Sequence, residues 1–342
     1  MHLLALKKAF IIIGFLGIAI GIYLYFLLFS SNTGRFHEKT YFFIPTGSTY
    51  ETVLKSLEEN QIIKDIHSFD KMARRLKYPA SVRPGKYEIK EGMGNYTLVQ
   101  MLRGGKQVPV KLVINKLRTK NDIIRKICSN LEADSNEMKL LFRDNSFLYK
   151  YEIDSNQIQT IIIPDTYQFY WNTNAKKAIE KIAKNHTKFW TNDRREKAKK
   201  LNLTIPQVIT LASIVEEETN KEEDKGKIAS TYLNRIKLGM PLQADPTLKF
   251  AVGDFKLKRL LTVHTQVSSP YNTYKNAGLP PGPICTPSAN TVDATLDAPS
   301  TNYLYFCARE DFKGYSNFAS SYSEHLLNAK KYQEALNQRG IK

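Results

Sequence analysis

The most constraining feature of the sequence is an uncharged apolar run near its start. From Ala9 to Ser30 the chain reads AFIIIGFLGIAIGIYLYFLLFS, 22 residues without a charged side chain. About 20 apolar residues in a helix cross the hydrocarbon core of a bilayer, and the run is longer than the apolar core of a cleaved signal peptide, about 7–15 residues. We therefore expect an uncleaved transmembrane anchor over residues 9–30. Residues 1–8, which carry Lys7 and Lys8, should stay in the cytoplasm.

Such an anchor makes the chain a single-pass protein of the cytoplasmic (inner) membrane, with its N-terminus inside. Residues 31–40 would form a linker, and everything after them would lie on the outer or periplasmic side. The chain has 50 basic and 33 acidic residues, a net charge of +17, which favours anionic partners. On the outer side of a membrane, a cell-wall polymer or lipid headgroups fit this charge better than nucleic acid.

Residues 41–158 carry the patterns of a small α+β region. A strand-like stretch is followed by an amphipathic helix from about Thr49, whose apolar face includes Val53 and Leu57. Pro84-Gly85 predicts a turn, and Gly104-Gly105 predicts the end of a second helix. A strand is expected over 108–114, and helical patterns recur over 119–131 and 174–190.

From residue 159 to the end the pattern predicts a mixed α/β domain with long loops, which makes the chain α+β overall. A helix pair is expected over 206–219 and 224–238, followed by segments dense in Pro, Gly, Asn and Tyr. Long irregular loops inside a folded domain are common sites of binding and chemistry. The six histidines and three cysteines show no metal-ligand or disulfide spacing, and we expect neither a metal nor another cofactor.

Three adjacent carboxylates, Glu216, Glu217 and Glu218, end the first helix of that pair. At about 100° per residue, the apolar side chains of 208–215 cluster on one side, and Glu217 falls almost opposite them. We expect Glu217 to be solvated, whereas Glu216 and Glu218 flank the apolar stripe. A carboxylate at that edge is partly desolvated, which raises its pKa and lets it donate a proton near neutral pH. The pattern also fits a solvated acidic helix end, and it prefers Glu218 to Glu216 only mildly.

Five segments occur in a characteristic order: LASIVEEET, YLNRIKLGMPLQADPT, SPYNTY, GLPPGPI and YLYF. In this order and near this spacing they resemble the MltG (YceG-like) family of membrane-anchored endolytic murein transglycosylases. PDTYQFY, RPGKYEIKEGM and the apolar N-terminal run are similar to that family too, so the resemblance covers nearly the whole chain. It implies a small LysM-like module within 41–158 and a catalytic transglycosylase domain over 159–342.

The resemblance also implies roles for single residues. The family's catalytic acid directly precedes a threonine, and that position corresponds to Glu218 followed by Thr219. The residues that the resemblance places in the substrate cleft are Gln243, Asp245, Tyr271, Asn272, Thr273, Tyr274, Leu279, Pro280, Pro281 and Gly282. The chain departs from the family pattern at Pro287-Ser288, where the family has Pro-Gly.

The function implied by the resemblance is cleavage of the MurNAc–GlcNAc β-1,4 bond within nascent peptidoglycan strands. The products would end in 1,6-anhydroMurNAc, and strand length would be limited. One carboxylate suffices, because the MurNAc 6-hydroxyl is the nucleophile. The implied partners are peptidoglycan strands, the cell membrane and peptidoglycan synthases.

Three alternatives stay open. A muramidase-type hydrolase would use Asp245 as a second carboxylate and leave reducing ends. A non-catalytic peptidoglycan-binding anchor would bind strands equally well without Glu218. A basic nucleic-acid binder would require that the apolar run is no anchor, and the dispersed basic residues do not form a nucleic-acid-binding pattern. We therefore predict no nucleic-acid partner.

Overall fold

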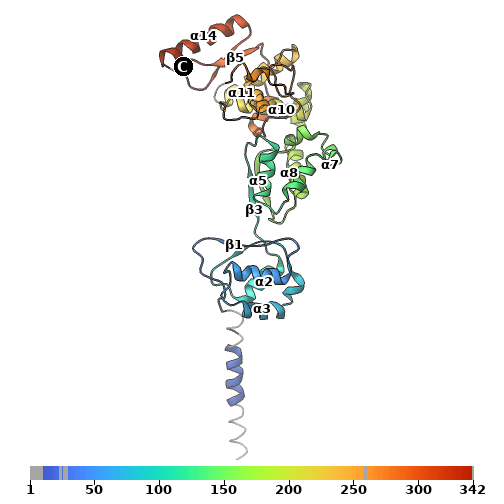
Figure 1. Cartoon of the computed structure of the whole chain (residues 1–342), viewed down its shortest axis with the longest axis vertical. Coiled ribbons are helices and arrows are strands. Elements are labelled where there is room, and N and C mark those ends of the chain that lie inside the picture. Colours follow the sequence, from blue (N-terminus) through green and yellow to red (C-terminus); the bar gives the residue numbers. More distant parts are fainter. Residues whose placement is uncertain (1–10, 23–24, 26–29, 258–259, 341–342) are drawn as a thin grey trace, which may run out of the picture. The chain divides into compact units, whose positions relative to one another are not determined.

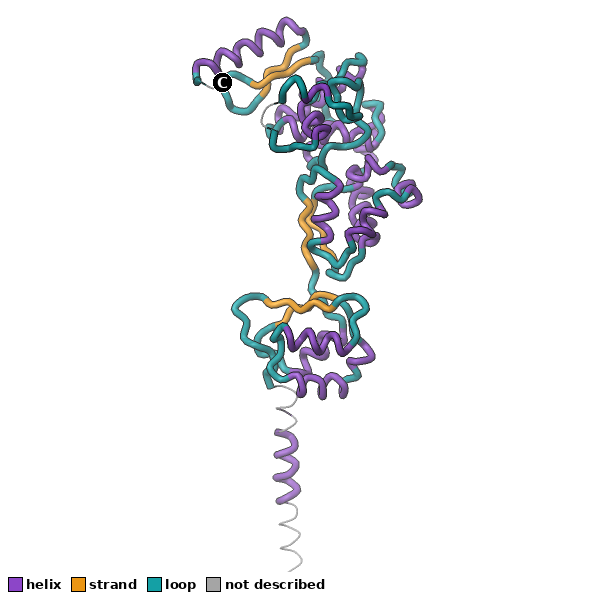
Figure 2. Tube along the Cα trace, viewed as in Figure 1, coloured by secondary structure: helices purple, strands orange, loops and turns teal. Residues whose placement is uncertain are grey.

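The computed structural model describes residues 11–22, 25, 30–257 and 260–340. Within these residues the fold is mixed α+β, as expected, and divides into two compact units (Figure 1, Figure 2). The first unit runs to Lys111 and also contains 130–132 and 168–174. The second unit contains 112–129, 133–167 and the chain from Ala175 onward.

The start of the described chain is a helical segment over residues 11–22, and its side chains are exposed. Residues 1–8, the predicted tail, and part of 9–30, the predicted anchor, lie outside the described residues. In the part of the chain that the structure describes, no helix combines the length and the apolarity needed to cross a bilayer.

The first unit is built on two antiparallel strands, β1 (Thr40–Ile44) and β2 (Gly85–Ile89). Thr40 lies opposite Ile89, and Ile44 lies opposite Gly85. The helical elements of this unit are α2 (Tyr50–Glu59), α3 (Ile66–Arg75), the 3₁₀ turn η1 (Tyr78–Ser81) and α4 (Asn95–Gly104). They pack together with the strands around one apolar core.

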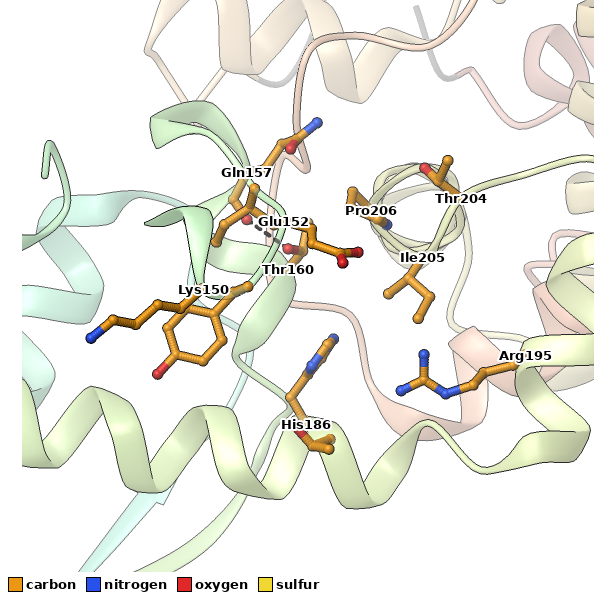
Figure 3. Close-up of a pocket in the computed structure, with 12 residues that line it drawn as sticks. Lys150, Glu152, Gln157, Thr160, His186, Arg195, Thr204, Ile205 and Pro206 are labelled. Atoms are coloured by element: carbon orange, nitrogen blue, oxygen red, sulfur yellow. Dashed lines mark hydrogen bonds between the residues drawn. The ribbon is translucent and has the colours of Figure 1, made fainter. Parts of the chain in front are cut away.

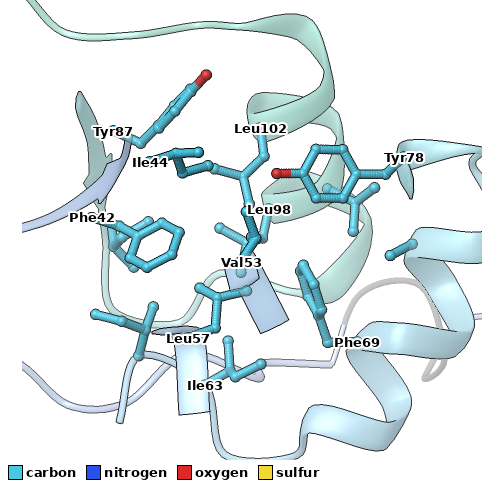
Figure 4. Packing of buried hydrophobic residues seen from close by; sticks show 14 of the residues in the cluster. Phe42, Ile44, Val53, Leu57, Ile63, Phe69, Tyr78, Tyr87, Leu98 and Leu102 are labelled. Carbon is cyan, nitrogen blue, oxygen red and sulfur yellow. The ribbon is translucent and has the colours of Figure 1, made fainter. Parts of the chain in front are cut away.

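Two of the helices around this core begin, end or face the core where the sequence patterns predict. Thr49 caps α2, because its side chain accepts a hydrogen bond from the N–H of Thr52. Val53 and Leu57 of α2 are buried against Phe42 and other core residues (Figure 4). The predicted helix and its apolar face are confirmed. The predicted stop after α4 is confirmed as well, since Gly105 has a left-handed backbone, with φ 65°.

The second unit begins within β3 (Val110–Ile114), at Leu112, and β3 pairs with β4 (Asp165–Phe169). Its first helical elements are α5 (Lys120–Cys128), α6 (Ser135–Leu141), α7 (Asn145–Tyr149), the 3₁₀ helix η2 (Ser155–Ile161), α8 (Ala175–Phe189) and α9 (Asn192–Lys200). The strand expected over 108–114 and the helices expected over 119–131 and 174–190 are confirmed, each somewhat shorter than predicted.

The centre of the second unit is α10 (Ile205–Glu218), which packs against α9, α11 (Glu222–Lys237), α12 (Asp245–Val252) and α13 (Ala289–Leu296). Every residue from Val208 to Val215 is buried, so α10 lies inside the unit. The 3₁₀ turn η3 (His264–Gln266) follows α12, and the chain ends with a hairpin of β5 (Tyr305–Ala308) and β6 (Ser316–Ala319), on which α14 (Tyr322–Gln338) packs. The predicted helix pair is confirmed as α10 and α11.

Candidate active site

Helix α10 carries the three adjacent glutamates at its C-terminal end. Its N-terminus is fixed by a capping box, in which the side chains of Thr204 and Gln207 accept each other's backbone N–H. The helix ends at Glu218, and the next residue, Thr219, is extended. Because α10 is buried along its length, its last turn brings all three carboxylates against neighbouring elements, and each finds a different environment.

Glu216 is bound to the start of α13. Its carboxylate accepts hydrogen bonds from the hydroxyls of Ser288, at 2.9 Å, and Thr291. The Lys225 ammonium lies 4.0 Å away. Ser288 stands where the family pattern has glycine, so in this chain that position supplies a hydroxyl to Glu216. These contacts give Glu216 a structural role, which joins α10 to α13.

Glu217 is not solvated, and the prediction from helix geometry was wrong. Its side chain is only 15% exposed and forms ion pairs with Lys116, at 3.0 Å, and Arg118, at 2.9 Å. Burial raises the pKa of Glu217, but the hydrogen bonds and charges of Arg118 and Lys116 outweigh burial and leave the pKa below its usual range. Glu217 is therefore ionised at neutral pH and holds the 116–118 segment against α10.

Glu218 has the properties of an acid catalyst. Its carboxylate is enclosed and accepts one hydrogen bond, 2.6 Å long, from the phenol of Tyr232 on α11. Burial raises the pKa of Glu218 to about 7, and the charge of Asp245 adds to this, whereas the Tyr232 hydrogen bond opposes it. Near neutral pH a large fraction of Glu218 is protonated, so the group can both donate and accept a proton.

Glu218 lines a cavity of about 330 Å³ in the second unit. The walls come from α10, α11, the start of α12, β5 and α14. The other lining residues are Tyr232, Arg235, Leu242, Gln243, Asp245, Tyr274, Tyr305, Phe306 and His325. The cavity combines carboxylates, hydroxyls and aromatic rings, a composition suited to sugars.

Asp245 and Tyr274 form a pair within this cavity. The Tyr274 phenol donates a short hydrogen bond to Oδ1 of Asp245. Beside them, Gln243 has a left-handed backbone with φ 52°, and its N–H donates to the carbonyl of Thr273 at 3.1 Å. A non-glycine residue in that conformation is uncommon and is often found where a side chain must be aimed at a functional site. The cavity therefore holds three of the predicted cleft residues together with Glu218.

Arg235 and two aromatic side chains complete the cavity. The Arg235 guanidinium is buried and donates to the carbonyls of Leu304, at 2.7 Å, and Leu242, at 2.8 Å. It therefore joins α11 to the chain segments before β5 and α12. The rings of Tyr305 and His325, which also line the cavity, are stacked, with centroids 5.3 Å apart and planes 22° apart.

Two predicted cleft residues support the cavity without lining it. Asn272 is fully buried and donates to the carbonyls of Thr265 and Val267, while its Oδ1 accepts the N–H of Tyr274 at 3.0 Å. The Thr273 hydroxyl accepts the N–H of Ala244 at 3.0 Å. These contacts fix the loop that carries Tyr274 next to the start of α12.

The remaining predicted cleft residues lie in the packing around the cavity. The Tyr271 ring packs on Phe250, with centroids 4.7 Å apart, and Leu279 packs against the apolar core that includes α10 and α11. Gly282 is buried so close to the Asn156 carbonyl that a Cβ would lie 2.3 Å from its oxygen. Of the neighbouring prolines, Pro280 is buried and Pro281 is half-buried. None of these five is among the residues that line the Glu218 cavity.

Several cavity residues were not predicted from the sequence. They are Tyr232, Arg235, Leu242, Tyr305, Phe306 and His325. Tyr232 and Arg235 lie in the segment YLNRIK, and Tyr305 and Phe306 lie in YLYF. Both segments are part of the family resemblance, but nothing in their composition indicates which side chains face Glu218. Among the described residues, no group of three or more His, Cys, Asp or Glu side chains is placed to hold a metal ion.

This chain is similar to known proteins in sequence and in fold. An endolytic murein transglycosylase of Bacillus subtilis is 29% identical over 314 residues, which cover 86% of this chain and 85% of that protein. A protein of the same name from Streptococcus pneumoniae is 27% identical over 319 residues, and this chain spans only 57% of its length. A crystal structure of a YceG-like protein from Listeria monocytogenes has a TM-score of 0.57 and 27% identity, covering 85% of this chain and 98% of that one.

The family assignment follows from a match over most of the chain. Residues 42–331 match the model of the YceG-like family. That range includes most of both compact units of the structure and all the residues that line the Glu218 cavity. The resemblance seen in the sequence motifs is thereby confirmed, and the chain belongs to the YceG-like family.

Proposed function

We propose that this chain is an endolytic lytic transglycosylase that cleaves the MurNAc–GlcNAc β-1,4 bond of peptidoglycan, with Glu218 as its acid and base. The relatives from Bacillus subtilis and Streptococcus pneumoniae carry the name endolytic murein transglycosylase. The observation that carries the proposal is the enclosed Glu218 carboxylate, with a pKa of about 7, in a cavity with aromatic and polar walls. A single carboxylate of this kind suits a reaction whose nucleophile belongs to the substrate.

The first half of the reaction breaks the glycosidic bond. Protonated Glu218 donates its proton to the oxygen between MurNAc and GlcNAc, and the bond from MurNAc C1 to that oxygen breaks. The electron pair of the bond leaves with the oxygen, so GlcNAc departs with a free hydroxyl, and positive charge develops at C1. The new Glu218 carboxylate is stabilised by the hydrogen bond from Tyr232.

The second half closes the ring. The MurNAc 6-hydroxyl attacks C1 and forms the 1,6-anhydro bond, and its proton returns to Glu218. The enzyme is regenerated, and water is neither consumed nor released. General acid–base assistance of this kind contributes roughly 10²–10⁴-fold to the rate.

The rest of the cavity would bind and orient the strand. The stacked rings of Tyr305 and His325 offer an apolar face to a sugar ring. Gln243 and the Asp245–Tyr274 pair offer hydrogen-bonding groups in the same cavity. Arg235 donates its hydrogen bonds to carbonyls of the chain, so we assign it to holding the walls together.

Hydrolysis is the second candidate reaction, because Asp245 lines the same cavity as Glu218. In a muramidase, Asp245 would act as the second carboxylate. The phenol of Tyr274 donates a hydrogen bond to Asp245. One of the two carboxylate oxygens that a second catalytic carboxylate would use is therefore already engaged. We therefore favour the transglycosylase reaction.

We also propose that the chain is anchored in the cytoplasmic membrane, with the catalytic domain on the outer side. The helical residues 11–22 are apolar and exposed, and the uncharged run continues to Ser30. In this proposal 41–158 is the LysM-like region, 159–342 is the catalytic domain, and the substrate is the nascent strand near the membrane. Peptidoglycan synthases, which extend such strands, are the proposed protein partners.

Mass spectrometry of the digestion products tests the proposed reaction. Uncrosslinked peptidoglycan strands are incubated with the full chain in detergent, and the new ends are identified. Internal fragments ending in 1,6-anhydroMurNAc are expected. Reducing MurNAc ends would assign hydrolysis and a role for Asp245, and intact strands with retained binding would assign a non-catalytic wall-binding protein. Membrane fractionation of the full chain and of a chain starting at Ser31 tests the anchor: only the full chain should sediment with membranes.

A further inference from the structure

A second cavity, of about 460 Å³, lies at the opposite end of α10 from Glu218 (Figure 3). It is formed by the chain after α7, by η2, α8 and α9, and by the first turn of α10, all within the second unit. The lining residues are Lys150, Tyr151, Glu152, Ile153, Gln157, Thr160, His186, Thr187, Arg195, Thr204, Ile205 and Pro206. None of them lines the Glu218 cavity, so the catalytic reaction does not account for it.

Two opposite charges face this cavity without neutralising each other. Figure 3 shows the Arg195 guanidinium and the Glu152 carboxylate pointing toward the same space. Arg195 Nε donates to the carbonyl of Trp190 at 3.0 Å, which fixes the direction of the side chain. Both residues are solvent-exposed, and no ion pair among the described residues involves either of them. One wall therefore offers a cation and the other offers an anion to whatever enters.

His186 lies in the same wall as Arg195 and carries no charge. Burial, with a smaller contribution from the charge of Arg195, lowers the pKa of His186 to about 4, so the imidazole is neutral at physiological pH. Its Nε2 is buried and has no hydrogen-bond partner among the described residues. Because this nitrogen is closed to solvent, the groups that the cavity opens to a ligand are the charged side chains of Arg195 and Glu152.

The cavity also has an apolar part. Ile153, Ile205 and Pro206 line it, beside the charged groups. A ligand that matches all these features carries one carboxylate, one amine, amide groups and small apolar side chains. Short peptides have this chemistry, whereas a sugar has neither charge. The peptides on peptidoglycan carry alanine methyls and free carboxylates, and before crosslinking they also carry the free amine of their diamino acid.

We propose that this cavity binds the peptide of an uncrosslinked peptidoglycan strand, with a peptide carboxylate on Arg195 and the free amine on Glu152. The proposal rests on the proposed function, since it adds a second contact to the same substrate. Crosslinking turns the amine into a neutral amide, which cannot pair with Glu152. The cavity thereby selects strands that have not yet been joined into the wall.

The two cavities lie at the two ends of α10. Helix α10 has 14 residues, and at about 1.5 Å per residue its two ends are about 20 Å apart. An extended pentapeptide reaches about 17 Å. Because this reach is shorter than the helix, and residues 208–215 of α10 are buried, a peptide held in this cavity belongs to another sugar of the strand than the one at Glu218.

The test measures peptide binding directly, without cleavage. The pentapeptide L-Ala-γ-D-Glu-L-Lys-D-Ala-D-Ala and its form acetylated on the lysine amine are titrated into the full chain by calorimetry. Arg195→Gln, Glu152→Gln and acetylation should each raise Kd by about two- to fivefold, the size expected for loss of one solvent-exposed ion pair. Lys200→Gln, which removes an exposed cation from the same helix outside the cavity, should leave Kd unchanged.

Titrating the acetylated peptide into the Glu152→Gln variant separates recognition of the amine from a general effect of charge. If Glu152 pairs with the amine, acetylation should have little further effect on the Glu152→Gln variant. Independent, additive effects would overturn the amine assignment, and the absence of binding, or binding that no cavity variant changes, would overturn the site. These outcomes do not depend on catalysis: a chain that binds the peptide but leaves strands uncut would refute the proposed function and keep this site.

Discussion

The phenol of Tyr232 donates a hydrogen bond of 2.6 Å to Oε1 of Glu218. Tyr232 lies on α11 and is almost fully buried, so the contact between α10 and α11 fixes the position of the carboxylate. The hydrogen bond stabilises the ionised form, whereas burial stabilises the protonated form. The balance between these two effects sets the pKa of Glu218, and therefore the pH above which its carboxyl group is mostly ionised.

Replacing Tyr232 with phenylalanine should shift the pH dependence of cleavage upward. The variant loses the hydrogen bond that lowers the pKa of Glu218, so Glu218 stays protonated to a higher pH. The basic limb of the kcat/KM profile, expected near pH 7 in the parent chain, should therefore move to higher pH by about one unit, while the maximal rate falls. Tyr170→Phe, at an exposed position, is the matched control. An unchanged basic limb would mean that Glu218 is not the titrating acid.

Asp245→Asn should shift the same limb in the opposite direction. The negative charge of Asp245 raises the pKa of Glu218, and its removal should lower that pKa and reduce activity at neutral pH. The products should still end in 1,6-anhydroMurNAc, because Asp245 takes no part in the proposed chemistry. The measurement is the pH–rate profile combined with end analysis of the products. Complete loss of cleavage with intact strand binding would favour a hydrolase with two carboxylates.

The stability of the chain should depend on Glu218 over a defined pH range. The folded pKa of about 7 lies above the ordinary value of 4.5, so the unfolded state releases this proton first. The favourable contribution is complete below about pH 4.5 and is lost as the pH rises to about 7. Glu218→Gln should therefore be more stable than the parent chain at about pH 8, by about 2–3 kcal/mol, with a smaller difference at about pH 4. Denaturant unfolding of the variant and the parent chain at both pH values measures this difference in stability. Equal stability of the two chains at both pH values would contradict the enclosed environment of Glu218.

Glu217→Gln should destabilise the second unit without changing the products. It leaves Lys116 and Arg118, each about one-third exposed, without their carboxylate. We expect a loss of about 1–2 kcal/mol, less than for a fully buried pair. Because the pKa of Glu217 is lowered in the folded chain, its contribution should disappear as the pH falls through the titration of the carboxylate. Glu223→Gln, on the exposed first turn of α11, is the control for urea unfolding.

The elements of the site were largely predictable, but their side-chain partners were not. Helices α10 and α11 follow from apolar periodicity, and the position of Glu218 beside the apolar stripe gave a mild preference that the family motif strengthened. Glu217 was assigned to solvent because a helix pattern describes only neighbours on the same helix. Its partner Arg118 is 99 residues away in the sequence, and no local pattern encodes that contact.

The same reason explains the cavity walls. Tyr305 and His325 come from β5 and α14, and their ring stacking depends on how α14 packs on the final hairpin. Asn272 and Thr273 were predicted to lie in the cleft, and the structure gives them hydrogen bonds that hold the loop of Tyr274. A motif indicates that a segment belongs to a site, but only the tertiary fold shows which side chains face the cavity.

The most direct test of the central claim compares Glu218→Gln with Glu216→Gln on uncrosslinked peptidoglycan strands. Both variants should keep the circular dichroism spectrum of the parent chain, and mass spectrometry should quantify anhydroMurNAc ends. Glu216→Gln should still cleave, because Glu216 hydrogen-bonds to Ser288 and Thr291 at the start of α13. Glu218→Gln should lose at least about 10²-fold in rate. Cleavage by folded Glu218→Gln at the parent rate, or its loss only in Glu216→Gln, would contradict the account.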